Sequence, residues 1–254
     1  MKHFFYTLLL ASSALAGANT FANDKTICGM NDDRIPSYNP KIARASSKGQ
    51  LVGCTVTMIG KSCAVSAGHC VGALEKLSFN VPENNEGLPV ASAPEDTYLR
   101  SKDYLRYKDQ GAGNDWAVIK IEKNEITGKY PGEVQGHYGV HLEPYGEVGD
   151  IIRITGHGHD TENRDKAFIQ QTHTGEIIKM GKWFNKSYFE YRVDTMGGNS
   201  GSSIIHEQSQ KIIGIHTHGG CRQSGTSGNM GTILFKNDIF REAVRSCLEW
   251  EKQL

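Results

Sequence analysis

The sequence lacks several features that mark large classes of proteins. Its 254 residues include no apolar run of the roughly 18 residues that a membrane-spanning helix needs, so we expect no membrane partner. Its 28 basic and 28 acidic residues cancel, which argues against a nucleic acid as partner. The absence of a Cys-x-x-Cys pair leaves a zinc ribbon or a thioredoxin-like redox site without support.

The N-terminus is typical of a secretory signal peptide, which we assign to residues 1–22. The segment MKHFFYTLLLASSALAGANTFA opens with Lys2 and His3, continues apolar to about Leu15 and then becomes small and polar. Cleavage after Ala18 or Ala22 fits the requirement for small residues. We therefore expect a secreted protein, periplasmic or extracellular, whose six cysteines can form disulfides.

Short runs rich in β-branched residues predict an all-β fold, a sandwich or a barrel. They read CTVTMIG, SCAVSAG, DWAVIKIE, DIIRITGHG, SYFEYRVDT, KIIGIHTHG and GTILF. Residues 83–113 are polar and rich in turn formers, so we expect long surface loops there. One helix is predicted, over residues 236–250, with Asn237 or Asp238 as its cap. Its apolar face comprises Ile239, Phe240, Ala243, Val244, Cys247 and Leu248.

The segment DTMGGNSGSS, residues 194–203, is rich in glycine and in hydroxyl side chains. A nucleophilic serine needs exposure, an adjacent base and N–H donors near the oxygen that becomes charged. Glycine lets a substrate carbonyl approach such donors closely. We therefore assign Ser200 as candidate nucleophile and the N–H groups of Gly198 and Ser200 as candidate oxyanion hole. Ser202 stands where the G-x-S-x-G elbow of α/β-hydrolases requires glycine, which excludes that elbow.

Two further segments offer a base and a carboxylate. SAGHC places His69 just after an apolar strand, and GNDWAVIKI places Asp115 at the start of another. A carboxylate entering an apolar strand is costly unless it has a partner, so we expect Asp115 to pair with His69. Taken one at a time, a solvated Asp115 and a plain Gly/Ser loop remain the alternatives.

These segments together resemble the chymotrypsin-like, or trypsin-fold, serine peptidases, which carry His, Asp and Ser in this order. CGMNDDR, CTVTMIGKSCAVSAGHCVG, ITGHGHD, DTMGGNSGSS and IIGIHTHGG most resemble the bacterial glutamyl endopeptidase branch. The resemblance extends over about residues 27–250. It implies two packed six-stranded antiparallel β-barrels, over residues 27–130 and 131–235, with a C-terminal α-helix across them.

The resemblance also implies a function. His69, Asp115 and Ser200 would be the catalytic residues of a serine endopeptidase, and Cys54 and Cys70 would form a disulfide behind the histidine. Such an enzyme works through an acyl-enzyme and needs neither a cofactor nor a metal. Its partners would be protein or peptide substrates, and we expect a monomer.

The implied primary pocket leaves two substrate classes open. Asp194 stands six residues before the serine, where an aspartate selects Arg or Lys in the family. Thr195 and His216 stand where the glutamyl branch binds an acidic side chain, and the segment GIHTHGGC extends this pocket wall to Gly219. Thr217 matches the hydroxyl that backs the catalytic carboxylate. We favour Glu or Asp at P1, with Arg or Lys as the alternative.

Asn199 suggests how the enzyme is activated. Vertebrate digestive members have an aspartate here, which pairs with a freed N-terminal ammonium, and a neutral amide cannot make that ion pair. By analogy with the glutamyl branch, we expect a zymogen that is cleaved near Ile27, with the new N-terminus near the pocket.

The remaining cysteines have no unique pairing. Met196 stands at the usual partner site of Cys221, so Cys221 is expected to pair with Cys28 or Cys247 or to stay free. Cys63 lies in a predicted strand and could be an unpaired packing residue, so its pairing also stays open.

Two other readings stay open. HGHD (His157, His159, Asp160) and HTH (His216, His218) have the i, i+2 spacing of ligands on one strand face, although we expect surface or pocket histidines there. The whole chain could also be a catalytically silent relative, used as a binding module or a toxin-like effector.

Overall fold

The computed structural model describes residues 26–184, 186–222 and 225–254, so the expected signal peptide, residues 1–22, lies outside the described residues. The strands are β1 Ile35–Pro36, β2 Ile42–Ser46, β3 Cys54–Met58, β4 Cys63–Ser66, β5 Lys76–Ser78, β6 Thr97–Asp109, β7 Asp115–Ile121, β8 Ile151–Gly156, β9 Gln171–Trp183, β10 Lys186–Tyr191, β11 Ser203–His206, β12 Lys211–His218 and β13 Asn229–Ile233. The helices are α1 Pro131–Val134 and α2 Asp238–Glu251, with 3₁₀ turns η1 Gly68–Ala73, η2 Pro94–Asp96 and η3 Arg164–Lys166.

The first barrel contains β2 to β7. Its strands follow the order β2-β3-β4-β7-β6-β5, and β5 pairs with β2 to close the ring. Every pairing is antiparallel, and closure removes the free strand edges that would otherwise invite aggregation. All residues of β3 and β4 are buried, as are all but one of β7, because the second barrel and α2 cover this barrel from outside.

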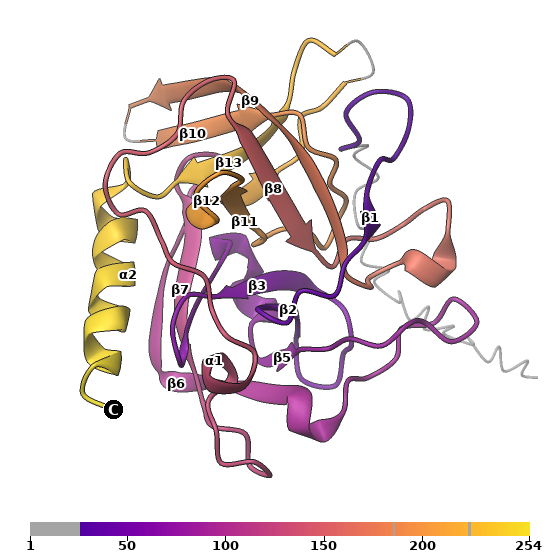
Figure 1. Cartoon of the computed structure of the whole chain (residues 1–254), viewed down its shortest axis with the longest axis vertical. Helices are drawn as coiled ribbons and strands as arrows, with labels where there is room; N and C mark the ends of the chain where they lie inside the picture. Colours follow the sequence, from indigo (N-terminus) through magenta and orange to yellow (C-terminus); the bar gives the residue numbers. More distant parts are fainter. Residues whose placement is uncertain (1–25, 185, 223–224) are drawn as a thin grey trace, which may run out of the picture.

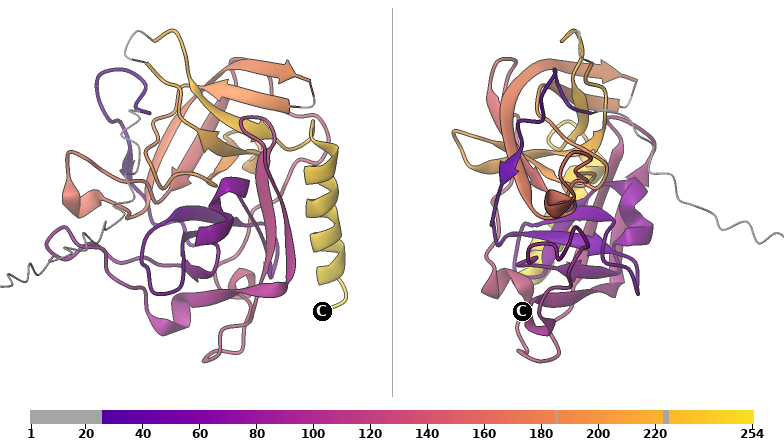
Figure 2. Two further views of the ribbon diagram at one scale, coloured as in Figure 1. Left: turned by 180° about the vertical axis from the view of Figure 1, so that it is seen from behind. Right: turned by 90° about the vertical axis from the view of Figure 1, so that its right-hand side faces the viewer.

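The second barrel contains β8 to β13. Its sheet order is β9-β10-β13-β12-β11-β8, and an additional pairing of β8 with β9 closes it into six antiparallel strands. The short strand β1 joins the outside of β9. Figures 1 and 2 show the two barrels stacked, with β8 to β13 above β2 to β7. The predicted all-β fold with two packed six-stranded barrels and a C-terminal helix is confirmed.

Helix α2 runs along the side of the stacked barrels and packs on β7 (Figure 1). The side chain of Asn237 caps it by accepting a hydrogen bond from the Phe240 N–H at 3.1 Å, and Phe240 stacks on Trp116 with 5.0 Å between ring centroids. The prediction that Ile239 belongs to the buried face is wrong, since its side chain is 59% exposed. Ile239 precedes the buried Phe240 by one residue, which is a rotation of about 100° around the helix axis. Its side chain therefore lies at the edge of the apolar stripe.

Two further expectations are corrected. Residues 97–109, expected as surface loop, form β6. Tyr98 and Ser101 are buried, whereas the exposed residues of this strand are mostly polar because they meet solvent. Cys63 is not an unpaired packing residue, because it forms a disulfide with Cys247 of α2. Within the described residues, the helices are too short and too polar for any of them to cross a membrane.

Candidate active site

A buried carboxylate and a half-exposed imidazole meet at the junction of the barrels. Asp115 opens β7 and is fully buried, and its Oδ2 lies 2.6 Å from Nδ1 of His69 in η1. Its Oδ1 accepts hydrogen bonds from the N–H groups of Gly68 and His69, at 2.6 and 3.1 Å. The backbone of Asp115 is tied in turn to Thr232 of the second barrel, whose Oγ1 donates to the Asp115 carbonyl at 2.8 Å.

The carboxylate sets the basicity of the imidazole. Burial alone would lower the pKa of His69, but the hydrogen bond and the charge of Asp115, assisted by the charge of Asp109, outweigh it and raise the pKa above its ordinary value. The same hydrogen bond places the proton of the neutral ring on Nδ1 and leaves Nε2 as the acceptor.

Ser200 lies between β10 and β11 in a loop of the second barrel that packs against β3 and the turn that carries His69. Its carbonyl accepts a hydrogen bond from the Thr55 N–H at 2.9 Å and lies 3.7 Å from Sγ of Cys70. Among the described residues, neither the N–H of Gly198 nor that of Ser200 donates to a backbone carbonyl. Gly198 has φ +101°, and a Cβ there would lie 2.5 Å from the His157 carbonyl, so the loop requires glycine.

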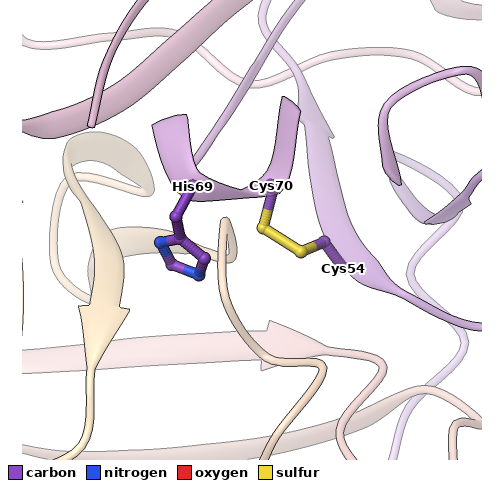
Figure 3. A group of neighbouring side chains, drawn as sticks. All are labelled: Cys54, His69 and Cys70. Carbon is purple, nitrogen blue, oxygen red and sulfur yellow. A yellow bond between two sulfur atoms is a disulfide. The ribbon is translucent and has the colours of Figure 1, made fainter. Parts of the chain in front are cut away.

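A disulfide supports the histidine turn. Cys54 and Cys70 are bonded, and Figure 3 shows this bridge beside the His69 ring. The two sulfurs and the imidazole lie close enough to suggest a metal site, but disulfide sulfurs are not the thiolates that bind metals. The implied Cys54–Cys70 bridge is confirmed, and Cys221 takes Cys28 as its partner, one of the pairings left open.

The candidate pocket residues have distinct partners. Both carboxylate oxygens of Asp194 accept backbone hydrogen bonds, from the N–H of Cys28 at 2.7 Å and from that of Asp33 at 2.9 Å. His216 is buried, with Nδ1 2.6 Å from the hydroxyl of Tyr191. Burial lowers the pKa of His216 to about 3, with the nearby His218 and His69 adding to the effect, so this imidazole is neutral.

Three residues at this pocket escaped prediction from the sequence. Asn229 donates from Nδ2 to Oγ1 of Thr195 at 3.0 Å, and Tyr191 orients His216. Thr26 is buried, with its hydroxyl on the Thr195 carbonyl and its methyl group against Gly219. No sequence motif marks these three residues. Each contacts the pocket only because the fold brings together segments that are distant in the sequence.

Thr217 and His218 lie on the same strand beside Asp115. The Thr217 hydroxyl contacts the Met230 carbonyl at 3.5 Å and Nδ1 of His218 at 2.8 Å, and no hydrogen bond joins it to the carboxylate among the described residues. His218 is the neighbour of Asp115 instead, with 4.0 Å between Nδ1 and Oδ2.

The HGHD segment has internal partners. The buried Nδ1 of His157 lies 3.3 Å from the Phe168 carbonyl, and Asp160 accepts from the N–H groups of Glu162 and Asn163. Burial lowers the pKa of His157 to about 3. These contacts are those of a neutral core histidine and of a turn-stabilising aspartate.

The amino-acid sequence is similar to known peptidases. The model of the trypsin family matches residues 27–234. A curated relative, the glutamyl endopeptidase of Bacillus licheniformis, is 25% identical over 225 residues, 84% of this chain and 66% of that protein. A second, named as an extracellular metalloprotease of Bacillus subtilis, is 27% identical over 197 residues, 74% of this chain and 56% of that protein. The chain thus spans less than two thirds of the length of either relative.

Solved structures agree in fold. A Glu endopeptidase in complex with MPD superposes with a TM-score of 0.65 at 22% identity, covering 88% of this chain and all of that one. The structure of HBP gives a TM-score of 0.62 at 12% identity, with 86% and 97% covered. The family match covers most of the chain and both barrels. The chain therefore belongs to the trypsin family, and within it is similar to glutamyl endopeptidases.

Proposed function

We propose that this protein is an exported serine endopeptidase in which Ser200 is the nucleophile, His69 the general base and Asp115 the group that orients the base. The observation that carries the proposal is the buried Asp115 carboxylate 2.6 Å from Nδ1 of His69. Cys70, the residue after His69, contacts the serine loop, and the N–H groups at 198 and 200 make no backbone bond among the described residues. A protein that only binds peptides has no use for this combination.

The reaction follows from these positions. Ser200 Oγ attacks the scissile carbonyl carbon as its proton passes to Nε2 of His69, and Asp115 stabilises the resulting imidazolium. The N–H groups of Gly198 and Ser200 bind the oxyanion, each donor lowering the barrier by about 3 kcal/mol. His69 then protonates the leaving amine, and water, activated by the same imidazole, hydrolyses the acyl-enzyme. No cofactor enters any step.

The pocket contacts favour an acidic P1 side chain. Asp194 is engaged by two backbone N–H groups, so its charge is already compensated and is a poor partner for Arg or Lys. The Tyr191 hydroxyl lies 2.6 Å from Nδ1 of His216. In the tautomer in which Tyr191 donates this bond, Nε2–H of the neutral ring is the donor to a substrate carboxylate. The bound carboxylate then raises the pKa of His216 and strengthens its own binding. The Arg/Lys alternative requires Asp194 to leave its backbone partners.

Activation by processing near Ile27 fits the position of the N-terminal segment. Thr26 fills space between Thr195 and Gly219, and the Cys28–Cys221 disulfide keeps the following residues there after cleavage. A new α-ammonium group at this place adds positive charge beside the P1 carboxylate. Three disulfides suit an exported, monomeric enzyme.

Ser200→Ala tests the proposal against the silent-relative alternative. We expect turnover of a Glu-P1 peptide to fall by about 10⁶, with unchanged circular dichroism, because the nucleophile is lost and the fold is not. Ser202→Ala, which removes a neighbouring buried hydroxyl, is the matched control and should keep most activity. Full activity in Ser200→Ala, or none in the processed wild type, would refute the assignment.

A further inference from the structure

A basic groove lies next to the proposed active site. Residues from the β6–β7 turn, the end of β9, the start of β10, β13 and the start of α2 line a cavity of about 1340 Å³. Figure 1 shows these segments gathered at the upper left of the molecule. Its charged lining consists of Lys108, Lys182, Lys186, Lys236 and Asp238, and we call it the lysine groove.

The groove carries uncompensated positive charge. Its acidic residue, Asp238, is paired with Arg241 at 2.8 Å. Among the described residues, none of the four groove lysines has a carboxylate within 4.0 Å, whereas Lys179 and Lys252 do form such pairs elsewhere. Like charges gathered without counterions repel one another, so this arrangement lowers stability slightly and suits the binding of an anion.

Exposed apolar side chains share the groove. Phe184 is 84% exposed and Ile239 is 59% exposed, and both line it. A cavity that combines ammonium groups with an aromatic ring and an aliphatic side chain matches a peptide of mixed acidic and apolar sequence better than a purely ionic ligand.

The groove borders the proposed cleavage site, because Asn114, which precedes Asp115, lines it. The β6–β7 turn ends at Asp115, and the Lys108 carbonyl packs so closely on the histidine turn that a Cβ on Gly68 would lie 1.8 Å from it. Met230 lines the groove and pairs across the sheet with His218, whose ring centroid lies 6.1 Å from that of His69. A peptide with its P1 side chain at His216 would therefore reach the groove by way of His218, the last residue of β12, and its cross-strand partner Met230.

We propose that the lysine groove is a substrate-recognition site that selects Asp or Glu at the positions preceding P1, in the range P2 to P5. The inference rests on the proposed peptidase function and adds a second acidic requirement to it. The preferred substrates are then acidic stretches of protein cut within the stretch, and not isolated glutamates in a neutral context.

The test uses quenched fluorescent peptides with Glu at P1 and either Asp-Asp or Asn-Asn at P3 and P4. We expect kcat/KM to be about tenfold higher for the acidic peptide at 0.05 M NaCl, since several exposed charge pairs contribute a few-fold each. The ratio should approach one at 0.5 M NaCl, because salt screens exposed charges. In Lys182→Gln/Lys186→Gln the ratio should fall to about two at low salt.

Matched controls separate local from bulk charge. Lys123→Gln/Lys129→Gln removes the same charge from the loop between β7 and α1, at the bottom of Figure 1, and should keep the wild-type ratio. Peptides with the acidic pair at P3′ and P4′ should show no preference.

Three results would overturn the proposal. The first is equal cleavage of the Asp-Asp and Asn-Asn peptides at low salt, and the second is an equal loss of preference in both double variants. The third is groove-dependent binding of a heparin fragment without any peptide discrimination, which would indicate a site for sulfated polysaccharide. Failure to cleave any Glu-P1 peptide refutes the peptidase function instead, so the two failures are distinguishable.

Discussion

At the scale of single residues, the surroundings of His69 determine the pH range of the proposed activity. The neutral imidazole is the base, so activity is lost as the pH falls through the pKa of His69. Asp115 and Asp109 raise that pKa, and the acid limb of the kcat/KM profile should therefore have its midpoint above 6.5.

Asp109→Asn tests this electrostatic account without removing a residue that touches the substrate. Loss of the Asp109 charge should shift the acid limb to lower pH by a few tenths of a unit, with kcat/KM on the alkaline plateau nearly unchanged. The measurement is kcat/KM from pH 5 to 9. Asp103→Asn, on the same strand, is the control and should leave the midpoint in place. An equal shift in Asp103→Asn, or a shift to higher pH in Asp109→Asn, would contradict the account.

A second prediction at this scale concerns His216, the proposed donor to a P1 carboxylate. His216→Gln should reduce kcat/KM for Glu at P1 by about tenfold to 100-fold, the size of a hydrogen bond to a charged group. Labelling of Ser200 by a neutral serine-directed phosphonate should persist. Exposed His137→Gln serves as the control. If His216→Gln kept its Glu preference, or if Arg-P1 peptides proved the better wild-type substrates, the acidic pocket would be wrongly assigned.

At the scale of elements, local sequence patterns predicted most of the strands, because a strand's alternation and β-branched residues are local features. β3, β4, β7, β8, β10, β12 and β13 stand where β-branched runs predicted strands. β6 escaped prediction because its solvent-facing side is polar, so its sequence resembles a loop. The pairing of Cys63 with Cys247 escaped too, since no local signal links a strand to a helix 184 residues away.

That bridge should stabilise the fold more than the local one. In the chain-entropy account, a link across 184 residues is worth about 5 kcal/mol and one across 16 residues about 3 kcal/mol. Cys63→Ala/Cys247→Ala should therefore lower the free energy of unfolding more than Cys54→Ala/Cys70→Ala. Guanidinium denaturation in the Ser200→Ala background, which prevents self-digestion, measures both. The reverse order would show that α2 is held chiefly by packing of Phe240 on Trp116.

At the scale of the whole molecule, the site depends on contacts that join distant parts of the chain. The order of His69, Asp115 and Ser200 predicted their association, and the described geometry brings His69 and Asp115 into contact. The pocket roles of Thr26, Tyr191 and Asn229 could not be predicted, because each arises from contacts between segments that are distant in the sequence.

The contact of Thr26 with the second barrel leads to a prediction on maturation. Active protein should begin within a residue or two of Ile27, because Thr26 lies against Thr195 and Gly219 and only a chain that begins there places its α-ammonium group at the proposed pocket. N-terminal sequencing of active protein, together with its intact mass, measures this. Full activity in protein that begins at Asn19 or Asn23 would show that no such processing is required.

The central claim is that Ser200 is a nucleophile activated by His69, and covalent labelling tests it most directly. Processed protein is treated with a phosphonate that carries a glutamate-like P1 group, and the adduct is located by peptide mass spectrometry. We predict one adduct on Ser200 in the wild type and its loss in His69→Ala. An unlabelled Ser200 in protein that still cleaves peptides, or labelling that persists without His69, would contradict the mechanism.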